Sequence, residues 1–438
     1  MENQISEQSI KTGFSTFGLI WLGQTISLLG SGLTSFALGI WVYQTTGGVT
    51  SYALIALFIV VPTLLLSSVS GAVVDRWNYR NMMLASDAAS ALITLLIAGL
   101  FYTGRLELWH IYLSVAANAC FATFQQPAYI ALISKLVSSE QLGRASGMVQ
   151  MGLAVSDLFA PLLAGILVVQ ISVAGVILID FSTFLVAVAT LLLVNIPSQA
   201  KPAQALQNTN WDIPALLNET RLGWRYIAVR RGLLGLMAYL AIANFAAAVI
   251  NSILVPMLLN ITTTETIGII ISIAGGGMFA GSLVMSVWGG PKRRMQTVLA
   301  SELIKGFGII LIGLRPAAWL VAIGATLAHF AIPFSAASNQ AIWQMKIPQE
   351  IQGRVFAIRQ IVTRSIMPLA YLLVGPLADH VFEPLMRSPH GLFQAVGLVV
   401  GTGTGRGMGL LFSLMGLVIA ATATLGALIP AIRSVEEA

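Results

Sequence analysis

Long apolar segments separated by short polar interruptions run through almost the whole chain. We count twelve such segments, at roughly 14–42, 49–74, 82–103, 108–134, 145–171, 173–195, 232–259, 266–289, 296–314, 318–343, 355–378 and 408–432. A helix needs about 20 apolar residues to cross the hydrocarbon core of a bilayer. The pattern therefore predicts an all-α polytopic membrane protein with twelve transmembrane helices.

The longest polar interruption, 196–231, divides these segments into six and six. We expect an N-terminal six-helix bundle over 1–195, a cytoplasmic linker over 196–231 with an amphipathic helix around 213–230, and a C-terminal six-helix bundle over 232–438. A further apolar run at 391–400 is too short to span, so we expect it to be interfacial or re-entrant.

Short segments of the first half return in the second half. Leu84-Ala85-Ser86-Asp87 recurs as Leu299-Ala300-Ser301-Glu302, and Glu140-Gln141-Leu142-Gly143-Arg144 recurs as Glu350-Ile351-Gln352-Gly353-Arg354. Both pairs lie at corresponding places in the two halves. The repeat predicts two pseudo-symmetric bundles, an architecture found in transporters that alternate access around a midplane site.

Composition supports this class and excludes others. The chain is 57% hydrophobic and 9% charged, whereas soluble proteins carry about 25% charged residues. A single cysteine, Cys120, leaves no disulfide framework or cysteine-based metal site. There is no nucleophile–base set, so we expect no enzyme, and we expect no cofactor and no metal.

The distribution of positive charge indicates the topology. If both termini are cytoplasmic, the loops on that side hold most of the Lys and Arg residues, and the opposite loops hold only Arg105, Arg315, Arg387 and Arg406. This asymmetry satisfies the positive-inside rule. It explains the net charge of +6 without nucleic acid, and we expect a multi-pass protein of the bacterial inner membrane.

A motif follows the second apolar segment. Gly71, Val73, Asp75, Arg76 and Arg80 match the G-x-L-a-D-r-x-G-r-k motif in the loop between helices 2 and 3 of the major facilitator superfamily, which the chain resembles over nearly its whole length. It departs at Asn78, where the pattern has Gly, and at Tyr79, where it has a basic residue.

Within the superfamily the chain is similar to the macrolide and siderophore exporter branch of drug:proton antiporters. Three segments carry this resemblance: Trp343–Phe356, Gly375-Pro376-Leu377-Ala378-Asp379, and Phe382-Glu383-Pro384-Leu385-Met386. The resemblance implies a gating role for Gly71, Asp75, Arg76 and Arg80, and the alternative is a topology anchor. We expect Asp75→Asn to leave the protein in the membrane but to reduce transport.

Acidic residues inside a bilayer are costly and point to function. The proton-coupling candidates are Asp157, Asp87, Glu302 and Asp180. Asp157, near the middle of the fifth segment, is the first choice, with a structural hydrogen bond as the alternative. For Asp87 and Glu302 we favour pairing with loop arginines or, for Glu302, with Lys305 at i+3. For Asp180 we favour a structural role.

Arg364, about ten residues into the eleventh segment, is the remaining coupling candidate. It either counters Asp157 or an anionic substrate, or extends its stem to the cytoplasmic surface. The antiporter motif of helix 5 is partly kept, as Ala160-Pro161-x-x-Ala164-Gly165. No Lys or Arg occurs between 108 and 134, so the helix-4 arginine of many proton-coupled exporters has no match.

The resemblance also implies that helices 1, 4, 7 and 10 line a central cavity. Their polar residues predict an apolar, neutral cavity with scattered amides, with interhelical packing as the alternative for each. The candidates are Gln24, Ser31, Asn118, Gln125, Asn244, Asn251, Asn339 and Trp343.

Together these features predict a monomeric secondary-active exporter of a bulky amphipathic compound, such as a macrolide-like drug, a siderophore or a peptide natural product. Protons and membrane lipids are its other expected partners. A flippase-like transporter of lysophospholipids is the alternative within the same fold. A non-transporting receptor or scaffold is the alternative from another class.

Overall fold

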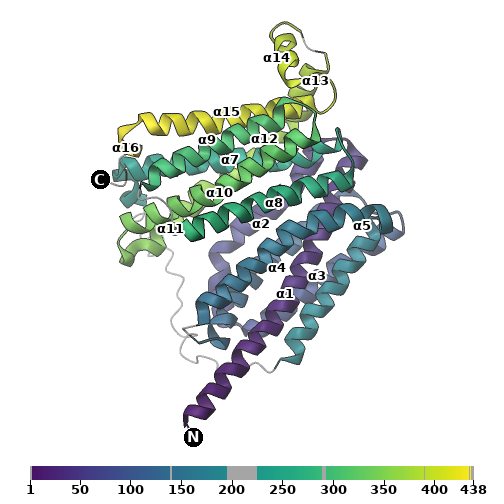
Figure 1. Cartoon of the computed structure of the whole chain (residues 1–438). Coiled ribbons are helices and arrows are strands. Elements are labelled where there is room, and N and C mark those ends of the chain that lie inside the picture. Colours follow the sequence, from purple (N-terminus) through teal and green to yellow (C-terminus); the bar gives the residue numbers. More distant parts are fainter. Residues whose placement is uncertain are drawn as a thin grey trace. The chain divides into compact units, whose positions relative to one another are not determined.

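The computed structural model describes residues 2–138, 141–194, 224–288, 293–388, 390–433 and 435. Within these ranges the chain is helical and contains no strand (Figure 1). Most of the predicted linker, and with it most of the predicted amphipathic helix, lies outside the described residues. Its boundaries therefore stay a prediction.

The described residues of the first half of the chain form five continuous stretches of helix. They are α1 (Glu2–Thr46), α2 (Val49–Arg76), α3 (Tyr79–Tyr102), α4 (Leu108–Leu136) and the merged α5 (Leu142–Leu193), in which two helices meet at Ser172. Ser172 has φ 64° and ψ 172°, a conformation that non-glycine residues rarely adopt. The break predicted between 171 and 173 therefore lies where the structure turns.

The second half begins with long helices and ends with shorter ones. They are α7 (Arg231–Leu259), α8 (Thr264–Trp288), α9 (Arg294–Leu314), α10 (Ala318–Lys346), α11 (Gln349–Arg364), α12 (Met367–Pro376), the π-helix η2 (Leu377–Phe382), α13 (Glu383–Arg387), α14 (Leu392–Val400), α15 (Arg406–Leu428) and α16 (Pro430–Arg433). Within the predicted helix 355–378, α11 and α12 are separated by a turn at Ser365 and Ile366, both of which keep helical φ and ψ. The short apolar run 391–400 forms α14.

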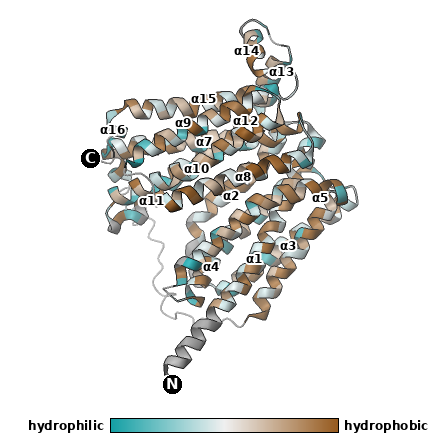
Figure 2. Ribbon diagram, in the orientation of Figure 1, coloured by the Kyte–Doolittle hydropathy of each residue, from teal (hydrophilic) through white to brown (hydrophobic). Residues whose placement is uncertain are grey.

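By length and hydropathy, ten of the described helices qualify as membrane spans. The number falls below twelve because the two helices of α5 are counted as one span and α4 is not among the ten. Figure 2 shows hydrophobic residues along most of the length of these helices. The predicted class, an all-α polytopic membrane fold, is confirmed.

The chain divides into two compact units. Unit 1 comprises Met1–Thr45 and Ile55–Thr209, and unit 2 comprises Thr46–Leu54 and Asn210–Ala438. Helix α2 is therefore shared, because its first residues group with unit 2 and the rest with unit 1.

Close helix crossings hold unit 2 together, with α9 packed against α10 and α15 (Figure 1). At the crossing of α9 and α10, a Cβ on Gly308 would lie 2.6 Å from the carbonyl oxygen of Gly324, and one on Gly324 would lie 2.5 Å from that of Gly308. Only glycine fits at both positions, as expected where membrane helices approach closely.

Candidate functional site

Unit 1 contains a cavity of about 630 Å³, within the range of small-molecule sites in proteins. Its wall is formed by residues of α1, α2, α3, α4 and both helices of α5. Apolar side chains such as Ile93 and Phe184 alternate with polar ones. Four of the predicted cavity residues line it, namely Gln24, Ser31, Asn118 and Gln125.

Asp87 lines this cavity and is bound by two side-chain amides. It is only 1% exposed, and its carboxylate accepts hydrogen bonds from Gln24 Nε2 at 2.8 Å and Gln125 Nε2 at 2.6 Å. Gln125 Nε2 also lies 3.1 Å from Gln24 Oε1. Residues of α1, α3 and α4 are thereby joined around one carboxyl group. Asp87 is bound by amides rather than by the loop arginines expected from the sequence.

A second carboxyl group, that of Asp180 on the later helix of α5, lines the same cavity. It is 2% exposed, and Ser31 Oγ donates to it at 3.4 Å. Gly30 makes room for it, because a Cβ there would lie 2.9 Å from Asp180 Oδ1 and 2.1 Å from Thr183 Oγ1. Asp180 thus lines the cavity, whereas the sequence favoured a structural role for it.

The lining of this cavity adds to the sequence prediction. Two carboxyl groups line it, and no Lys, Arg or His is among its described lining residues. The expectation of a neutral central cavity stays a prediction. Two buried polar atoms, Asn118 Oδ1 and Tyr129 Oη, have no hydrogen-bond partner among the described residues. Such atoms are rare in proteins, and here they offer an acceptor and a hydroxyl to a ligand.

Asp157 and Arg364 lie elsewhere. The Asp157 side chain is exposed on the earlier helix of α5 and does not line the cavity of unit 1. Arg364 is exposed at the last residue of α11 in unit 2. No partner group among the described residues supports the predicted coupling role of either side chain.

Glu302 stands at the position in unit 2 that repeats Asp87. It is 3% exposed, accepts a hydrogen bond from Ser335 Oγ at 2.8 Å, and forms an ion pair with Lys305. Among the described residues this is the one ion pair within 4 Å. The predicted i+3 partner is therefore present.

The other predicted cavity residues belong to unit 2 and serve different contacts. Asn244 donates to the carbonyl of Thr363 at 2.9 Å, and Asn251 is exposed. Asn339 is 5% exposed, and Trp343 is fully buried in a core cluster that includes residues of α7, α9, α10, α11 and α15. The guanidinium of Arg359 lies 5.2 Å from the Trp343 ring centroid. Their role in a cavity stays a prediction.

The predicted gating segment forms the end of α2 and the start of α3. Gly71, Asp75 and Arg76 lie in the last turns of α2. Arg80 donates from Nε to the carbonyl of Leu191 at 2.9 Å and from Nη2 to that of Leu192 at 3.0 Å. It therefore caps the last turn of α5, where a cation is favourable.

The departure from the family pattern at Asn78 has a local explanation. Asn78 is the N-cap of α3, and its side chain accepts hydrogen bonds from the backbone N–H groups of Arg80 at 3.0 Å and Asn81 at 3.3 Å. Asparagine is among the residues preferred at this position. The substitution of Gly by Asn therefore keeps a helix start at the same place.

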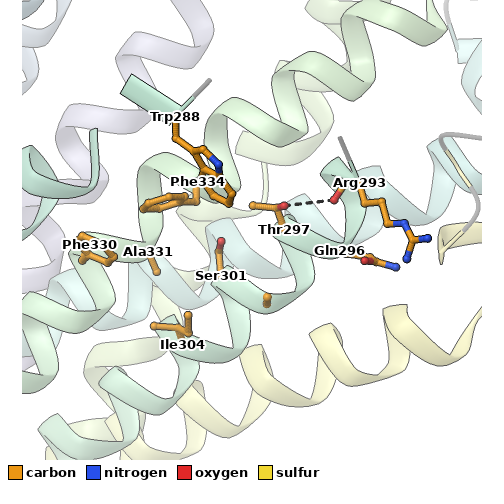
Figure 3. Close-up of a pocket in the computed structure, with 10 residues that line it drawn as sticks. Trp288, Arg293, Gln296, Thr297, Ser301, Ile304, Phe330, Ala331 and Phe334 are labelled. Carbon is orange, nitrogen blue, oxygen red and sulfur yellow. Dashed lines mark hydrogen bonds between the residues drawn. The ribbon is translucent and has the colours of Figure 1, made fainter. Parts of the chain in front are cut away.

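A second pocket, of about 540 Å³, lies in unit 2 where α8 ends and α9 begins, against α10. Figure 3 shows Trp288, Phe330 and Phe334 gathered on one side, with the guanidinium of Arg293 directed away from them. Thr297 Oγ1 donates to the backbone oxygen of Arg293 at 3.2 Å. Its described lining residues include no carboxyl group and none of the predicted site residues.

Comparison with known families decides the class of the protein. The model of the Major Facilitator Superfamily matches residues 20–371. The chain belongs to the major facilitator superfamily. It is thus a multi-pass membrane transporter and not an enzyme, as predicted from the sequence.

Two relatives within the superfamily carry the same name. Macrolide efflux protein A of Streptococcus pyogenes is 25% identical over 379 residues, covering 83% of this chain and 90% of the relative. Macrolide efflux protein A of Enterococcus faecalis is 27% identical over 314 residues, covering 68% of this chain and 91% of the relative. These two relatives confirm the resemblance to the macrolide exporter branch.

Solved structures of the superfamily share the fold. The crystal structure of the nucleoside transporter NupG is similar with a TM-score of 0.69 at 12% identity, and the match covers 94% of this chain and 99% of that one. At this identity the likeness concerns the fold alone.

Sequence reasoning missed that Asp87 and Asp180 share one cavity. The spacing of apolar residues places each in its helix but does not give the rotation of that helix about its axis. The repeat of Asp87 at Glu302 singled out the position, and Gln24 and Gln125 were both cavity candidates. One signal could have joined Gln24, Asp87 and Gln125. All three lie in apolar segments, where a polar side chain needs a partner.

Proposed function

We propose that the protein is a secondary-active exporter that exchanges protons for a bulky amphipathic compound carrying a protonated amine. Its relatives named macrolide efflux protein A support export. The cavity of unit 1 supports the substrate class, because its described lining residues are largely apolar and include two carboxyl groups but no cationic side chain. The proposed membrane is the bacterial inner membrane, with both termini in the cytoplasm.

The observation that carries the proposal is the environment of Asp87. Its two described hydrogen-bond donors are neutral amides, so the carboxyl group can take and release a proton without breaking an ion pair. Buried carboxyl groups that face a cavity are the usual proton carriers of transporters. We therefore favour Asp87 over Asp157 as the coupling residue and assign Asp180 to the amine of the substrate.

The cavity wall suits such a ligand. An ammonium group needs a carboxylate, and the amides and hydroxyls of Asn118, Ser31 and Tyr129 can pair with the oxygens of a large polyfunctional compound. Affinity would come from burial of its apolar surface, and the polar groups would orient it. Phosphorylated sugars and other anions would meet two carboxyl groups without a compensating cation.

The test is efflux of a panel of cationic, neutral and anionic amphipathic compounds from cells that lack other pumps, with and without a proton uncoupler. We expect efflux of the cationic members only, and its loss with uncoupler. Efflux that persists without a proton gradient would remove the antiport proposal. Movement of fluorescent lysophospholipid instead of any compound in the panel would favour the lipid alternative.

A further inference from the structure

The segment Gly375–Asp379 has no role in the cavity, yet it makes a specific contact with the start of α2. Asp379 lies in the π-helix η2. Its carboxylate accepts hydrogen bonds from the backbone N–H of Val49 at 2.9 Å and of Thr50 at 2.9 Å, and from the Thr50 hydroxyl at 2.7 Å. These three bonds, here named the Asp379 clasp, bind residues more than 300 positions apart in the sequence.

The clasp uses the electrostatics of a helix start. The first N–H groups of α2 have no carbonyl partner within the helix, and the helix dipole makes this end positive. A carboxylate bound there forms charge-assisted hydrogen bonds. Asp379 is only partly buried, so water can replace its partners when the clasp opens.

The backbone is built for this approach. A Cβ on Gly375 would lie 2.4 Å from Thr50 Cα and 2.7 Å from Thr50 Oγ1. Only glycine at position 375 therefore lets α12 and η2 come this close to the start of α2. The π-helix changes the direction of side chains after Pro376, and such segments are frequent at functional sites. Gly47, with φ 66°, forms the tight connection that precedes α2.

Two similar acidic segments serve the two ends of α2. Gly375-Pro376-Leu377-Ala378-Asp379 has the same spacing of Gly, aliphatic residue and Asp as Gly71-Ala72-Val73-Val74-Asp75. The second lies in the last turns of α2 itself, whereas the first binds the first turn. A helix from Val49 to Arg76 is about 40 Å long at 1.5 Å per residue, so the two segments lie on opposite sides of the membrane.

The position of the clasp within the chain points to a moving part. Residues 46–54 group with unit 2, whereas the rest of α2 groups with unit 1. Any displacement of the body of α2 with unit 1 must therefore bend the helix or release its first turn from Asp379. We propose that the Asp379 clasp opens and closes once in each transport cycle and acts as the gate on the side of the membrane where α2 begins. Asp379 is then a positioning residue that touches neither substrate nor the proton carrier.

This inference rests on the proposed exporter function, because the gate belongs to the transport cycle of that exporter. A cross-link separates a gate from a permanent support, because a permanent support can be fixed without loss of activity. A Cβ on Gly48 would lie 3.4 Å from Asp379 Oδ2. We would join Gly48→Cys to Asp379→Cys with a short bifunctional thiosulfonate, in a Cys120→Ser background that removes the native thiol.

We expect the cross-linked protein to lose at least about tenfold in efflux, which corresponds to 1.4 kcal/mol, and a reductant to restore it. Each single-cysteine variant treated with the same reagent should keep its rate. Full efflux by protein whose cross-link is complete on a gel would overturn the proposal.

A second measurement needs no transported compound and covers the case in which Asp379→Cys alone is inactive. Ser35→Cys places a thiol in the wall of the unit 1 cavity. We would follow its reaction with an impermeant maleimide added on the side where α2 begins. Asp379→Asn, which removes the charge but keeps the size, should raise the labelling rate about tenfold, since hydrogen bonds to a charged group contribute more than neutral ones.

Thr50→Val, which removes one of the three bonds, should raise the labelling rate less than Asp379→Asn does. The matched control is Thr63→Val on the same helix, because the Thr63 hydroxyl donates to Ile59 within α2 at 2.8 Å and takes no part in the clasp. An unchanged labelling rate in Asp379→Asn would refute the gate. If the wild-type protein exports no compound, the exporter proposal fails while the labelling result still decides the clasp.

Discussion

The two repeated carboxyl groups, Asp87 in unit 1 and Glu302 in unit 2, have the same local sequence and different surroundings. Both are almost fully buried. Asp87 is bound by two amides from other helices, and Glu302 is neutralised by Lys305 one turn along its own helix. A carboxylate paired with a cation loses an ion pair if it takes up a proton, and an amide-bound one does not. For the proposed proton exchange, this difference favours the first copy over the second as the proton carrier.

The strongest test of this comparison is the pair of charge-removing variants Asp87→Asn and Glu302→Gln. We expect Asp87→Asn to abolish uncoupler-sensitive efflux, because the carrier of the proton is gone, and Glu302→Gln to keep most of it. Both are measured as efflux from cells at matched amounts of protein in the membrane. The opposite ranking would place the proton in unit 2 and reverse the comparison.

The second test removes the cation of unit 2. Lys305→Met leaves the carboxylate of Glu302 buried without its partner, which should cost about 3 kcal/mol of stability and lower the unfolding temperature in detergent. The double variant with Glu302→Gln should regain most of that loss, because no charge is then left unpaired. An unfolding temperature unaffected by Lys305→Met would show that the ion pair does not stabilise unit 2.

A smaller effect is expected at the other carboxyl group of the unit 1 cavity. Asp180→Asn should weaken binding of a cationic compound about tenfold, or 1.4 kcal/mol, and leave a neutral analogue of the same shape unaffected. Equilibrium binding to purified protein measures both. Equal losses for the two compounds would indicate that Asp180 supports the cavity wall instead of pairing with the amine.

The smallest effect is expected at Asp157. Its side chain is exposed and lies outside the cavity, so Asp157→Asn should change efflux by less than about twofold, since surface substitutions away from such sites have little effect. A loss as large as that of Asp87→Asn would return the coupling role to the residue that the sequence favoured.

The sequence was sufficient for much of the fold, because hydrophobic runs of membrane length are strong signals. The turn at Ser172 lies where two predicted segments meet, and α14 coincides with the short apolar run 391–400. The turn between α11 and α12 at Ser365 and Ile366 was missed, because the run 355–378 has no polar interruption as long as those that separate the predicted segments. Pro368, in the first turn of α12, removes a backbone donor there and favours a helix start.

The site was less accessible to sequence reasoning. Distance from a helix end favoured Asp157, which lies near the middle of its segment, over Asp87, which lies near a helix start. Depth along a helix does not give the direction of a side chain. The hydrogen-bond partners distinguish Asp87 from Asp157, since Gln24 and Gln125 on neighbouring helices converge on Asp87. That convergence depends on tertiary packing.

The bonds around Asp87 also bear on how the chain is made. Gln24 emerges from the ribosome before Asp87, and Gln125 emerges after it, so α3 enters the bilayer with only one of its two partners already synthesised. Glu302 carries its counterion within the same turn and can insert as a neutral pair. Insertion of α3 should therefore depend on α1 and be completed only by α4, and a chain arrested before Gln125 should leave α3 less firmly placed than α9 would be in the same experiment.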